Sequence, residues 1–245
     1  MTAPLIDTVD PRQRRLGRKY APDPQDRAYE LTDRRMRLMR AAPVALRKLP
    51  WRLGPDRLDQ GDTSECTVHA AEHLLEAAPR VHQVGWTRAH RTALYERAQD
   101  VDEWPGTDYD GTSFRAVCKV LQADGYIGSY LWVFDEDAAR EYLTTRGPLA
   151  FGTEWFWNMF ETDARGYVEP TGALAGGHEV MLRWWYPKNH YKYPDTIEAL
   201  SSWGPEWGDG GLFRMKADAF RYLAFALNGD LCLPTELPRD VVLSA

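Results

Sequence analysis

Apolar residues in the first part of the chain recur at the spacing of an α-helix. The clearest case is the stretch 66–78, which Pro79 follows. Its apolar face consists of Ala70, Ala71, Leu74, Leu75 and Ala78. The same period predicts further helices over residues 28–42, 86–99, 113–124 and 135–147. Thr112 or Ser113 caps the helix that starts near residue 113, and Gly125 ends it.

The second part of the chain changes to short apolar runs separated by Gly and Pro turns. These runs predict strands over residues 148–155, 176–187, 195–204 and 210–216. Helices followed by strands indicate an α+β fold with two lobes and a site in the cleft between them. The expected organisation is a basic N-terminal extension or pro-region (1–46) and a body (47–245), divided into a helical lobe (about 47–145), a β lobe (about 146–220) and a C-terminal tail (221–245).

Charge is distributed unevenly between the extension and the body. The whole chain has a net charge of −6, whereas residues 1–50 hold 12 Lys or Arg against 6 Asp or Glu. A basic extension on an acidic body docks on that body, stays solvated, or binds an acidic partner. Docking or solvation is the favoured reading, and a nucleic-acid partner is not favoured.

Several classes of protein do not fit the sequence. No apolar run has the length of a membrane span. Residues 1–20 lack the apolar region of a secretory signal, which predicts a cytoplasmic or otherwise intracellular protein. The three cysteines are an odd number and widely spaced, so we expect no disulfide framework. Nothing in the pattern suggests a metal site or a cofactor.

Cys66 opens the predicted helix 66–78. The partial positive charge and free N–H groups at a helix N-terminus favour a thiolate, and Thr63 or Ser64 is the expected cap. A lone cysteine is also commonly a small buried apolar residue. A reactive thiol needs a base, which must come from elsewhere in the chain.

His178 is the histidine best placed to serve as that base. His69 and His73 lie on the same helix as Cys66, so we expect them to be surface or packing residues. His178 instead follows Gly176 and Gly177 at the start of a strand, where glycines let another chain approach closely. A polar residue that simply begins a strand remains the alternative reading.

A third motif, SSWGPEWGDGG, spans residues 201–211. By itself it indicates a compact turn covered by two indoles. Together with the stretch DQGDTSECT (59–67) and the AGGH sequence at 175–178, it resembles the papain-like (C1) cysteine peptidases, and the DQG variant is similar to bacterial members. The resemblance covers about residues 47–218 in the family's order.

The resemblance implies a peptide or protein substrate and a thiolate–imidazolium pair. Cys66 would attack a peptide carbonyl, and His178 would protonate the leaving amine. The side chain of Gln60 and the Cys66 N–H would hold the oxyanion. The substrate-binding positions that it implies are Gly111 on the cleft wall, Trp203 and Gly177.

This sequence departs from the family's motif at several positions. Ser201 stands where the family has the asparagine that orients the histidine; its hydroxyl can accept the same hydrogen bond but reaches less far. Glu65 and Glu179 add negative charge beside Cys66 and His178, and we expect Glu179 to face the other side of its strand. Thr63 replaces a cysteine of the family, so the family's matching disulfide cannot form.

Three readings follow from these residues. The first is an active cysteine peptidase. The second, motivated by Ser201, is a weak or inactive papain-like fold used for binding or assembly, with its tryptophans at an interface. The third keeps the catalytic pair but transfers an acyl group or cleaves another amide. In any of them, residues 1–46 would act as a pro-region over the cleft or as a tether.

Overall fold

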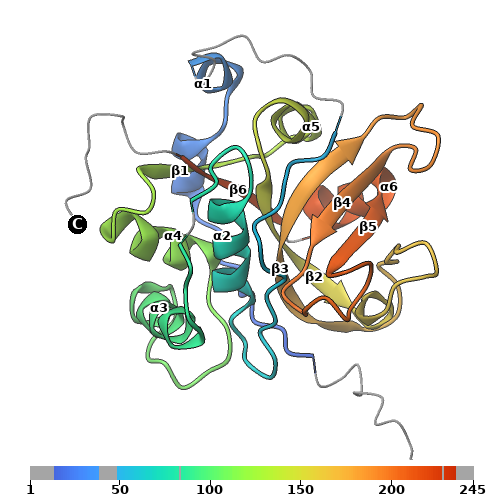
Figure 1. The fold of residues 1–245 in the computed structure, drawn as a ribbon. Coiled ribbons are helices and arrows are strands. Elements are labelled where there is room, and N and C mark those ends of the chain that lie inside the picture. Colours follow the sequence, from blue (N-terminus) through green and yellow to red (C-terminus); the bar gives the residue numbers. More distant parts are fainter. Residues whose placement is uncertain (1–13, 39–48, 83, 228, 236–245) are drawn as a thin grey trace, which may run out of the picture.

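The fold is an α+β architecture in which helices and one antiparallel sheet form two lobes (Figure 1). The computed structural model describes residues 14–38, 49–82, 84–227 and 229–235. Its helices are η2 (Pro24–Tyr29), α1 (Asp33–Leu38), α2 (Cys66–Glu76), α3 (Arg88–Val101), α4 (Phe114–Ala123), α5 (Glu136–Thr145), η3 (Trp157–Phe160), α6 (Ala217–Arg221) and the π-helix η4 (Tyr222–Ala226). Within this described part of the chain, no helix has the length and apolar character needed to cross a membrane.

Helix α2 is the centre of the helical lobe. Every residue of α2 is buried, because the helix packs against β3, α3 and α4. The packing alternative therefore holds for His69 and His73, both of which are 2% exposed, and the surface alternative is wrong. Helix α4 begins as predicted, with the Ser113 hydroxyl accepting a hydrogen bond from the Ala116 N–H at 3.1 Å.

The sheet has six strands in the order β1-β6-β2-β3-β4-β5, and each neighbouring pair is antiparallel. The predicted strands correspond to β2 (Leu149–Phe156), β3 (Leu174–Tyr186), β4 (Thr196–Leu200) and β5 (Leu212–Lys216). The sequence pattern does not predict β1 (Ser129–Trp132) or β6 (Asp230–Thr235). Strand β6 lies in the segment expected to be a tail and sits inside the sheet, between β1 and β2.

The two faces of the sheet belong to two different hydrophobic clusters. Along β2, Leu149 and Phe151 pack into the cluster that also contains α5 and α6 residues. Ala150, between them, packs into the cluster formed with α2, α3 and α4. This alternation follows the period of two in a β-strand. Elements of both lobes thus share one sheet, which holds them in a defined relative position.

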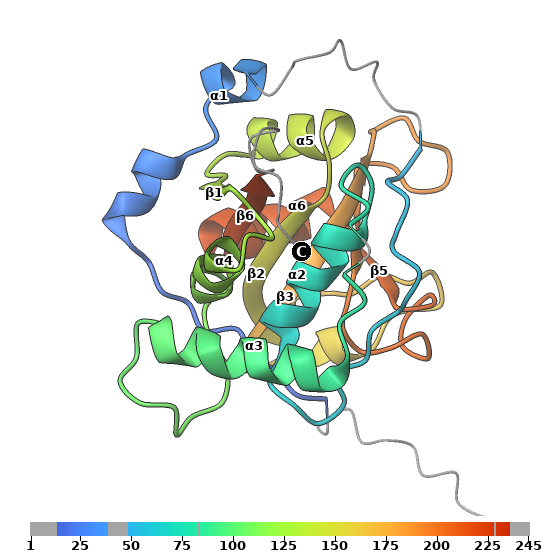
Figure 2. The ribbon, with the colours of Figure 1, turned by 60° about the vertical axis from the view of Figure 1, so that its left-hand side comes forward.

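The described N-terminal residues, 14–38, run along the body (Figure 2). The helix predicted over 28–42 is instead the 3-10 helix η2 and the short helix α1. They are interrupted where Glu30 pairs with Trp132 and the Leu31 N–H donates to the Trp132 carbonyl at 2.7 Å. A contact with a distant strand therefore overrides the local helical period; residues 39–42 lie outside the described residues.

Candidate active site

Cys66 occupies the first position of α2 and is completely buried. The prediction that Thr63 or Ser64 caps this helix is wrong. The N-cap is Glu65, which makes no side-chain capping bond, and the Thr63 hydroxyl donates to the Gln60 carbonyl instead. Among the described residues, no side chain caps the start of α2: the Val68 and His69 N–H groups donate to the Glu65 carbonyl at 3.1 Å, and the Thr67 N–H is directed at the Cys66 sulfur.

The environment of Cys66 favours the neutral thiol. Burial raises the pKa of the Cys66 thiol to about 12, although backbone hydrogen bonds from Glu179, Gly17 and Thr67 act in the opposite direction. The Glu179 N–H comes from β3 and the Gly17 N–H from the N-terminal segment. Three segments far apart in the sequence therefore meet at this sulfur atom.

His178 lies on β3 in an aromatic enclosure. Its Nε2 is 3.2 Å from the Ser201 Oγ in a hydrogen bond whose donor depends on the tautomer. The ring stacks on Trp203 at a centroid distance of 4.4 Å and meets Trp155 edge-on at 4.9 Å. Burial lowers the pKa of His178 to about 3. The Nδ1 atom has no hydrogen-bond partner among the described residues, and burial keeps the imidazole neutral at neutral pH.

Gln60 connects the loop before Cys66 to the turn that contains Trp203. Its backbone N–H donates to the Ser202 carbonyl at 2.8 Å, and its Oε1 accepts from the Ser202 hydroxyl at 2.5 Å. Asp59 forms an isolated antiparallel bridge with Trp203. The Gln60 Nε2 donates to the Thr63 carbonyl at 2.5 Å. These contacts bring the Gln60 and Trp203 motifs together.

The cleft is occupied by the chain's own residues 14–20, called here the leader segment. Gly17 and Arg18 both donate their N–H groups to the Gly177 carbonyl, at 3.1 and 3.0 Å. On the opposite wall, the Thr112 N–H donates to the Gly17 carbonyl at 2.9 Å, and the Lys19 N–H donates to the Thr112 carbonyl at 3.0 Å. The leader segment is thus an extended peptide clamped between two walls of the cleft.

Glycine permits the close approach at this crossing. A Cβ added to Gly17 would lie 1.9 Å from the Ser64 carbonyl oxygen, and one added to Gly177 would lie 2.3 Å from the Arg18 carbonyl oxygen. Gly111, predicted to line the wall, also adjoins the leader segment: a Cβ there would lie 2.4 Å from the Gly17 oxygen. The residue that pairs with the extended backbone, however, is its neighbour Thr112.

The start of the leader segment reaches the other predicted residues. The Arg14 guanidinium donates to the Trp203 carbonyl at 3.3 Å and lies 5.5 Å from the centroid of its ring. The Arg15 carbonyl accepts from the Gln60 Nε2 at 3.2 Å. A pro-region over the cleft is one of the two roles predicted for residues 1–46, but no local signal in the sequence indicates which of its residues cross the site.

The two acidic neighbours point to different places. The Glu65 carboxylate accepts a hydrogen bond from the Thr92 hydroxyl at 2.8 Å. Glu179 faces the opposite side of its strand from His178, as expected, and burial raises the pKa of its carboxyl well above the usual range. Among the described residues, no cluster of His, Cys, Asp or Glu has the arrangement of a metal site.

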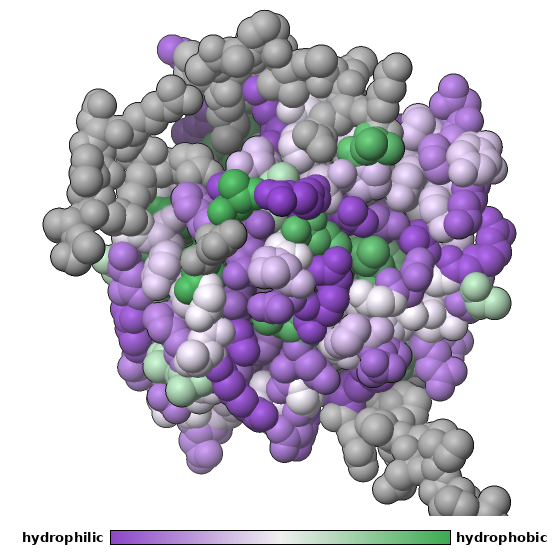
Figure 3. Space-filling view, viewed as in Figure 1, coloured by the Kyte–Doolittle hydropathy of each residue, from purple (hydrophilic) through white to green (hydrophobic). Residues whose placement is uncertain are grey.

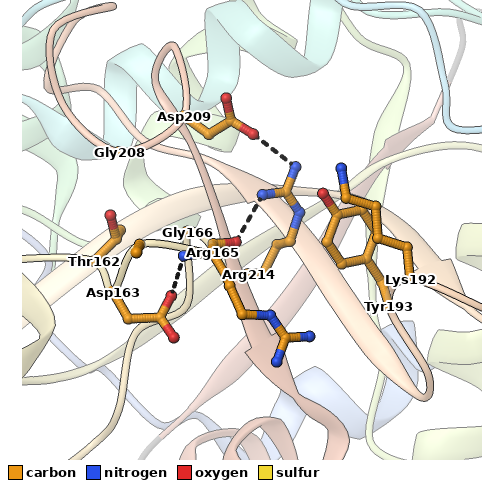
Figure 4. Close-up of a pocket in the computed structure, with 10 residues that line it drawn as sticks. Thr162, Asp163, Arg165, Gly166, Lys192, Tyr193, Gly208, Asp209 and Arg214 are labelled. Atoms are coloured by element: carbon orange, nitrogen blue, oxygen red, sulfur yellow. Dashed lines mark hydrogen bonds and ion pairs between the residues drawn. The ribbon is translucent and has the colours of Figure 1, made fainter.

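A separate cavity of about 470 Å³ is lined by charged side chains and lies apart from Cys66 and His178 (Figure 4). Its charges largely compensate each other. The Arg214 guanidinium pairs with Asp209 at 2.9 Å and with Glu198 at 3.0 Å. The Asp163 carboxylate accepts the Arg165 N–H at 2.8 Å. The lining holds three cationic and two acidic side chains, so its formal charge is only +1.

Comparison with solved structures identifies the fold. Xylellain, a cysteine protease from Xylella fastidiosa, superposes with a TM-score of 0.63 at 19% identity over 92% of this chain and 98% of that chain. Procathepsin L2 from Tenebrio molitor larval midgut gives 0.61 at 15% identity over 91% and 79%. ProCathepsin B S9 from Trypanosoma congolense gives 0.61 at 10% identity over 93% and 89%. The fold is therefore papain-like.

Sequence comparison gives weaker similarity. No family model matches the chain. The cathepsin B-like proteins CP3 and CP2 of Giardia intestinalis are 25% and 26% identical over 149 residues, which is 54% of this chain and 46% of each relative. The matched region thus spans about half the length of these curated relatives. Both comparisons point to papain-like cysteine proteases as the proteins that this chain resembles.

Proposed function

We propose that this chain is a papain-like cysteine peptidase held in a latent form by its leader segment. The observation that carries the proposal is an extended peptide lying across a buried Cys66, between Gly177 and Thr112. A cleft that already clamps one extended backbone has the donors and acceptors to clamp another. The bacterial protease xylellain, which matches over nearly its whole length, supports placing the chain with bacterial-type members.

Each predicted residue has a role in this proposal. After the leader segment moves away, the Cys66 thiolate attacks the carbonyl carbon of a peptide bond. Gln60 Nε2 and the Cys66 N–H donate hydrogen bonds to the oxyanion. His178 gives its proton to the leaving amine, which departs, and the acyl group stays on sulfur as a thioester. His178 then takes a proton from water, whose oxygen attacks the thioester and releases the acid.

Ser201 takes the part of the family's asparagine in this proposal. Its hydroxyl lies 3.2 Å from the His178 Nε2, close enough to accept the N–H and direct Nδ1 toward the cleft. The stack on Trp203 restricts rotation of the ring further. These contacts together let the shorter side chain hold the imidazole without a water bridge.

Latency follows from the chemistry of the covered site. The leader segment excludes water, which keeps the Cys66 pKa high and the His178 pKa low, so neither group is charged at neutral pH. The group directed at the sulfur is the Gly17 N–H, a donor, rather than a carbonyl carbon. A thiol in this arrangement has no electrophile to attack. Two of the structural relatives are themselves pro-forms by name.

The contacts of the basic extension favour docking on its own body. Arg18 pairs with Asp230, and Arg15 lies 3.6 Å from Asp110. An acidic partner for these described residues is therefore not proposed. The three cysteines are free and buried, which supports a protein that needs no oxidative folding and is consistent with an intracellular location.

The experiment compares three full-length chains on a mixture of fluorogenic peptides and on a thiol-directed probe. Wild type should be nearly inactive. Gly17→Ala, whose added methyl displaces the leader segment, should cleave peptides and label Cys66. The double variant Gly17→Ala, Cys66→Ala should do neither. Peptide cleavage that survives loss of Cys66, or no cleavage by a folded Gly17→Ala chain, would defeat the proposal.

One observation favours the alternative of a binding or assembly protein. Within the described residues, the buried His178 Nδ1 lacks a hydrogen-bond partner, so the pair is not joined in this state. Against it, eight of the ten tryptophans are buried, and the face seen in Figure 3 is mostly hydrophilic. The tryptophans thus build the core instead of an exposed interface. A folded, opened and inactive chain would select this alternative. Acyl transfer to an amine, or cleavage of non-peptide amides alone, would select the third reading.

A further inference from the structure

Three neighbouring strands place two acidic residues on either side of a glycine. Asp230 of β6 pairs with Gly152 of β2, and Gly152 pairs with Glu179 of β3 (Figure 2 shows the three strands). Residues that pair directly across strands point their side chains to the same face. Asp230 and Glu179 therefore flank a position that has no side chain. We call this arrangement the acidic slot.

The Arg18 side chain fills the acidic slot. Its Nε and Nη2 atoms lie 3.2 and 2.5 Å from the Asp230 Oδ2, and only 1% of the side chain is exposed. A Cβ added to Gly152 would lie 2.7 Å from the Arg18 Nε, 2.5 Å from the Asp230 Oδ1 and 2.6 Å from the Glu179 Oε2. The missing side chain at Gly152 is thus the space in which the guanidinium sits.

The chemistry of the slot selects a guanidinium. Glu179 is fully buried, and neither of its carboxyl oxygens has a hydrogen-bond partner among the described residues. Asp230 is only 19% exposed and pairs with Arg18, so an apolar occupant would leave this carboxylate without its donor, which is unfavourable. A planar guanidinium has five N–H donors and stays charged, so it can hydrogen-bond Asp230 while its positive charge acts on the nearby Glu179 carboxyl. The Tyr20 ring, 4.9 Å from the Arg18 guanidinium carbon, closes the outer side.

The position of the slot relates it to the reacting atoms. Arg18 directly follows Gly17, whose N–H is directed at the Cys66 sulfur. The leaving amine must depart near His178, which stacks on Trp203, and this is the end of the cleft that Arg14 occupies. The slot therefore lies at the other end of the cleft, on the acyl side of the bond to be cut. The leader segment thus runs through the cleft in the direction opposite to that of a substrate. Asp230 also lines a cavity of about 440 Å³ that continues beyond the slot.

We propose that the acidic slot selects an arginine side chain in the substrate, one residue to the amino side of the residue whose carbonyl Cys66 attacks. This rests on the proposed peptidase function and adds a substrate class to it. Arg18 of the leader segment and the substrate arginine compete for the Asp230 carboxylate and for the space at Gly152. Activation therefore vacates the specificity site and the reactive site together.

The test uses full-length chain that carries Gly17→Ala and Arg18→Ala, so that the slot is empty. Its substrates are two fluorogenic peptides that differ only by Arg or Leu at the selected position. We expect kcat/KM to be about 10- to 100-fold higher for the Arg peptide, as for charge-assisted hydrogen bonds in a buried site. Asp230→Asn, which keeps the shape, should reduce this ratio toward one, and Gly152→Ala should reduce it by filling the slot. A preference for Leu, or a ratio unchanged in both folded variants, would overturn the proposal.

A binding measurement separates this inference from the peptidase proposal. The same chain with Cys66→Ser is titrated with a labelled peptide RRLGRKYA, which copies residues 14–21, and with its Arg18→Leu counterpart. Tighter binding of the arginine peptide, reduced by Asp230→Asn, supports the slot even if no peptide is cleaved. Equal binding of both peptides overturns it, even where the cysteine peptidase activity is present.

Discussion

Replacement of Gly17 by alanine should convert Cys66 from an inert thiol into a reactive one. The new Cβ would lie 1.9 Å from the Ser64 carbonyl oxygen, whereas non-bonded heavy atoms prefer about 3.5 Å or more. The leader segment must therefore move by roughly 1 Å or more. Its backbone hydrogen bonds to Gly177 and Thr112, at 2.9–3.1 Å, cannot stretch that far. The leader segment is therefore expected to leave the cleft while the body keeps its fold.

The size of the effect follows from the bonds lost and from the thiol pKa. Four backbone hydrogen bonds hold residues 17–19, each with a net contribution of about 0.5–1.5 kcal/mol, so docking loses roughly 2–6 kcal/mol. In the covered state the Cys66 pKa of about 12 leaves about 1 thiol in 10⁵ ionised at pH 7. Of ordinary thiols, with a pKa of about 8.5, about 1 in 30 is ionised at pH 7. Uncovering should thus raise the alkylation rate by about 10³-fold.

The assay follows iodoacetamide labelling of Cys66 by peptide mass spectrometry at pH 7. Cys118 and Cys232, both buried, report any general unfolding in the same sample. Gly106→Ala is the control for backbone strain without a clash: its φ of 77° disfavours alanine, but a Cβ there meets nothing within 4 Å, so the Cys66 labelling rate should stay close to wild type. Hydrogen exchange of the backbone N–H at position 17 shows whether the leader segment has left. A freely exchanging Gly17→Ala segment with Cys66 still unreactive would refute the reasoning.

Other variants test the site and its burial, the first two in the Gly17→Ala chain. Ser201→Ala should lower kcat about 5- to 10-fold with little change in KM, because His178 loses about one hydrogen bond. Ser201→Asn should restore kcat. Equal kcat for the serine, alanine and asparagine chains would contradict an orienting role for Ser201. Gln60→Ala should lower kcat by about 10²–10³-fold, and a change in KM alone would argue against an oxyanion donor. Burial lowers the pKa of His73 to about 3, below its ordinary value. The unfolded chain therefore binds a proton at this residue more readily than the folded chain does, so its contribution to stability is complete above about pH 6.5 and is lost as the pH falls. At pH 5 the free energy of unfolding should be lower by about 2 kcal/mol. His73→Leu should flatten the fall in melting temperature between about pH 6.5 and 4, and an unchanged slope would contradict this.

Local patterns predicted the elements well where each pattern is self-contained. The Ser113 cap and the apolar face of α4 depend on residues only a few positions apart, and the structure has both. The helix predicted over 28–42 was wrong because Trp132, a residue about a hundred positions away, pairs with its middle. Strand β6 was missed for a similar reason, since a short run such as Asp230–Thr235 becomes a strand only when two others flank it.

The sequence by itself determined the order of the helices and strands and the residue types for thiol chemistry, because periodicity, capping and motif spacing are local properties. Only the tertiary structure decided that Gly17 lies against Cys66 and that Arg18 enters a slot more than two hundred residues away at Asp230. It also decided that the thiol and the imidazole are neutral in the covered state, since burial depends on every segment packed around them. Such contacts join distant parts of the chain through shape and charge, which no local pattern records.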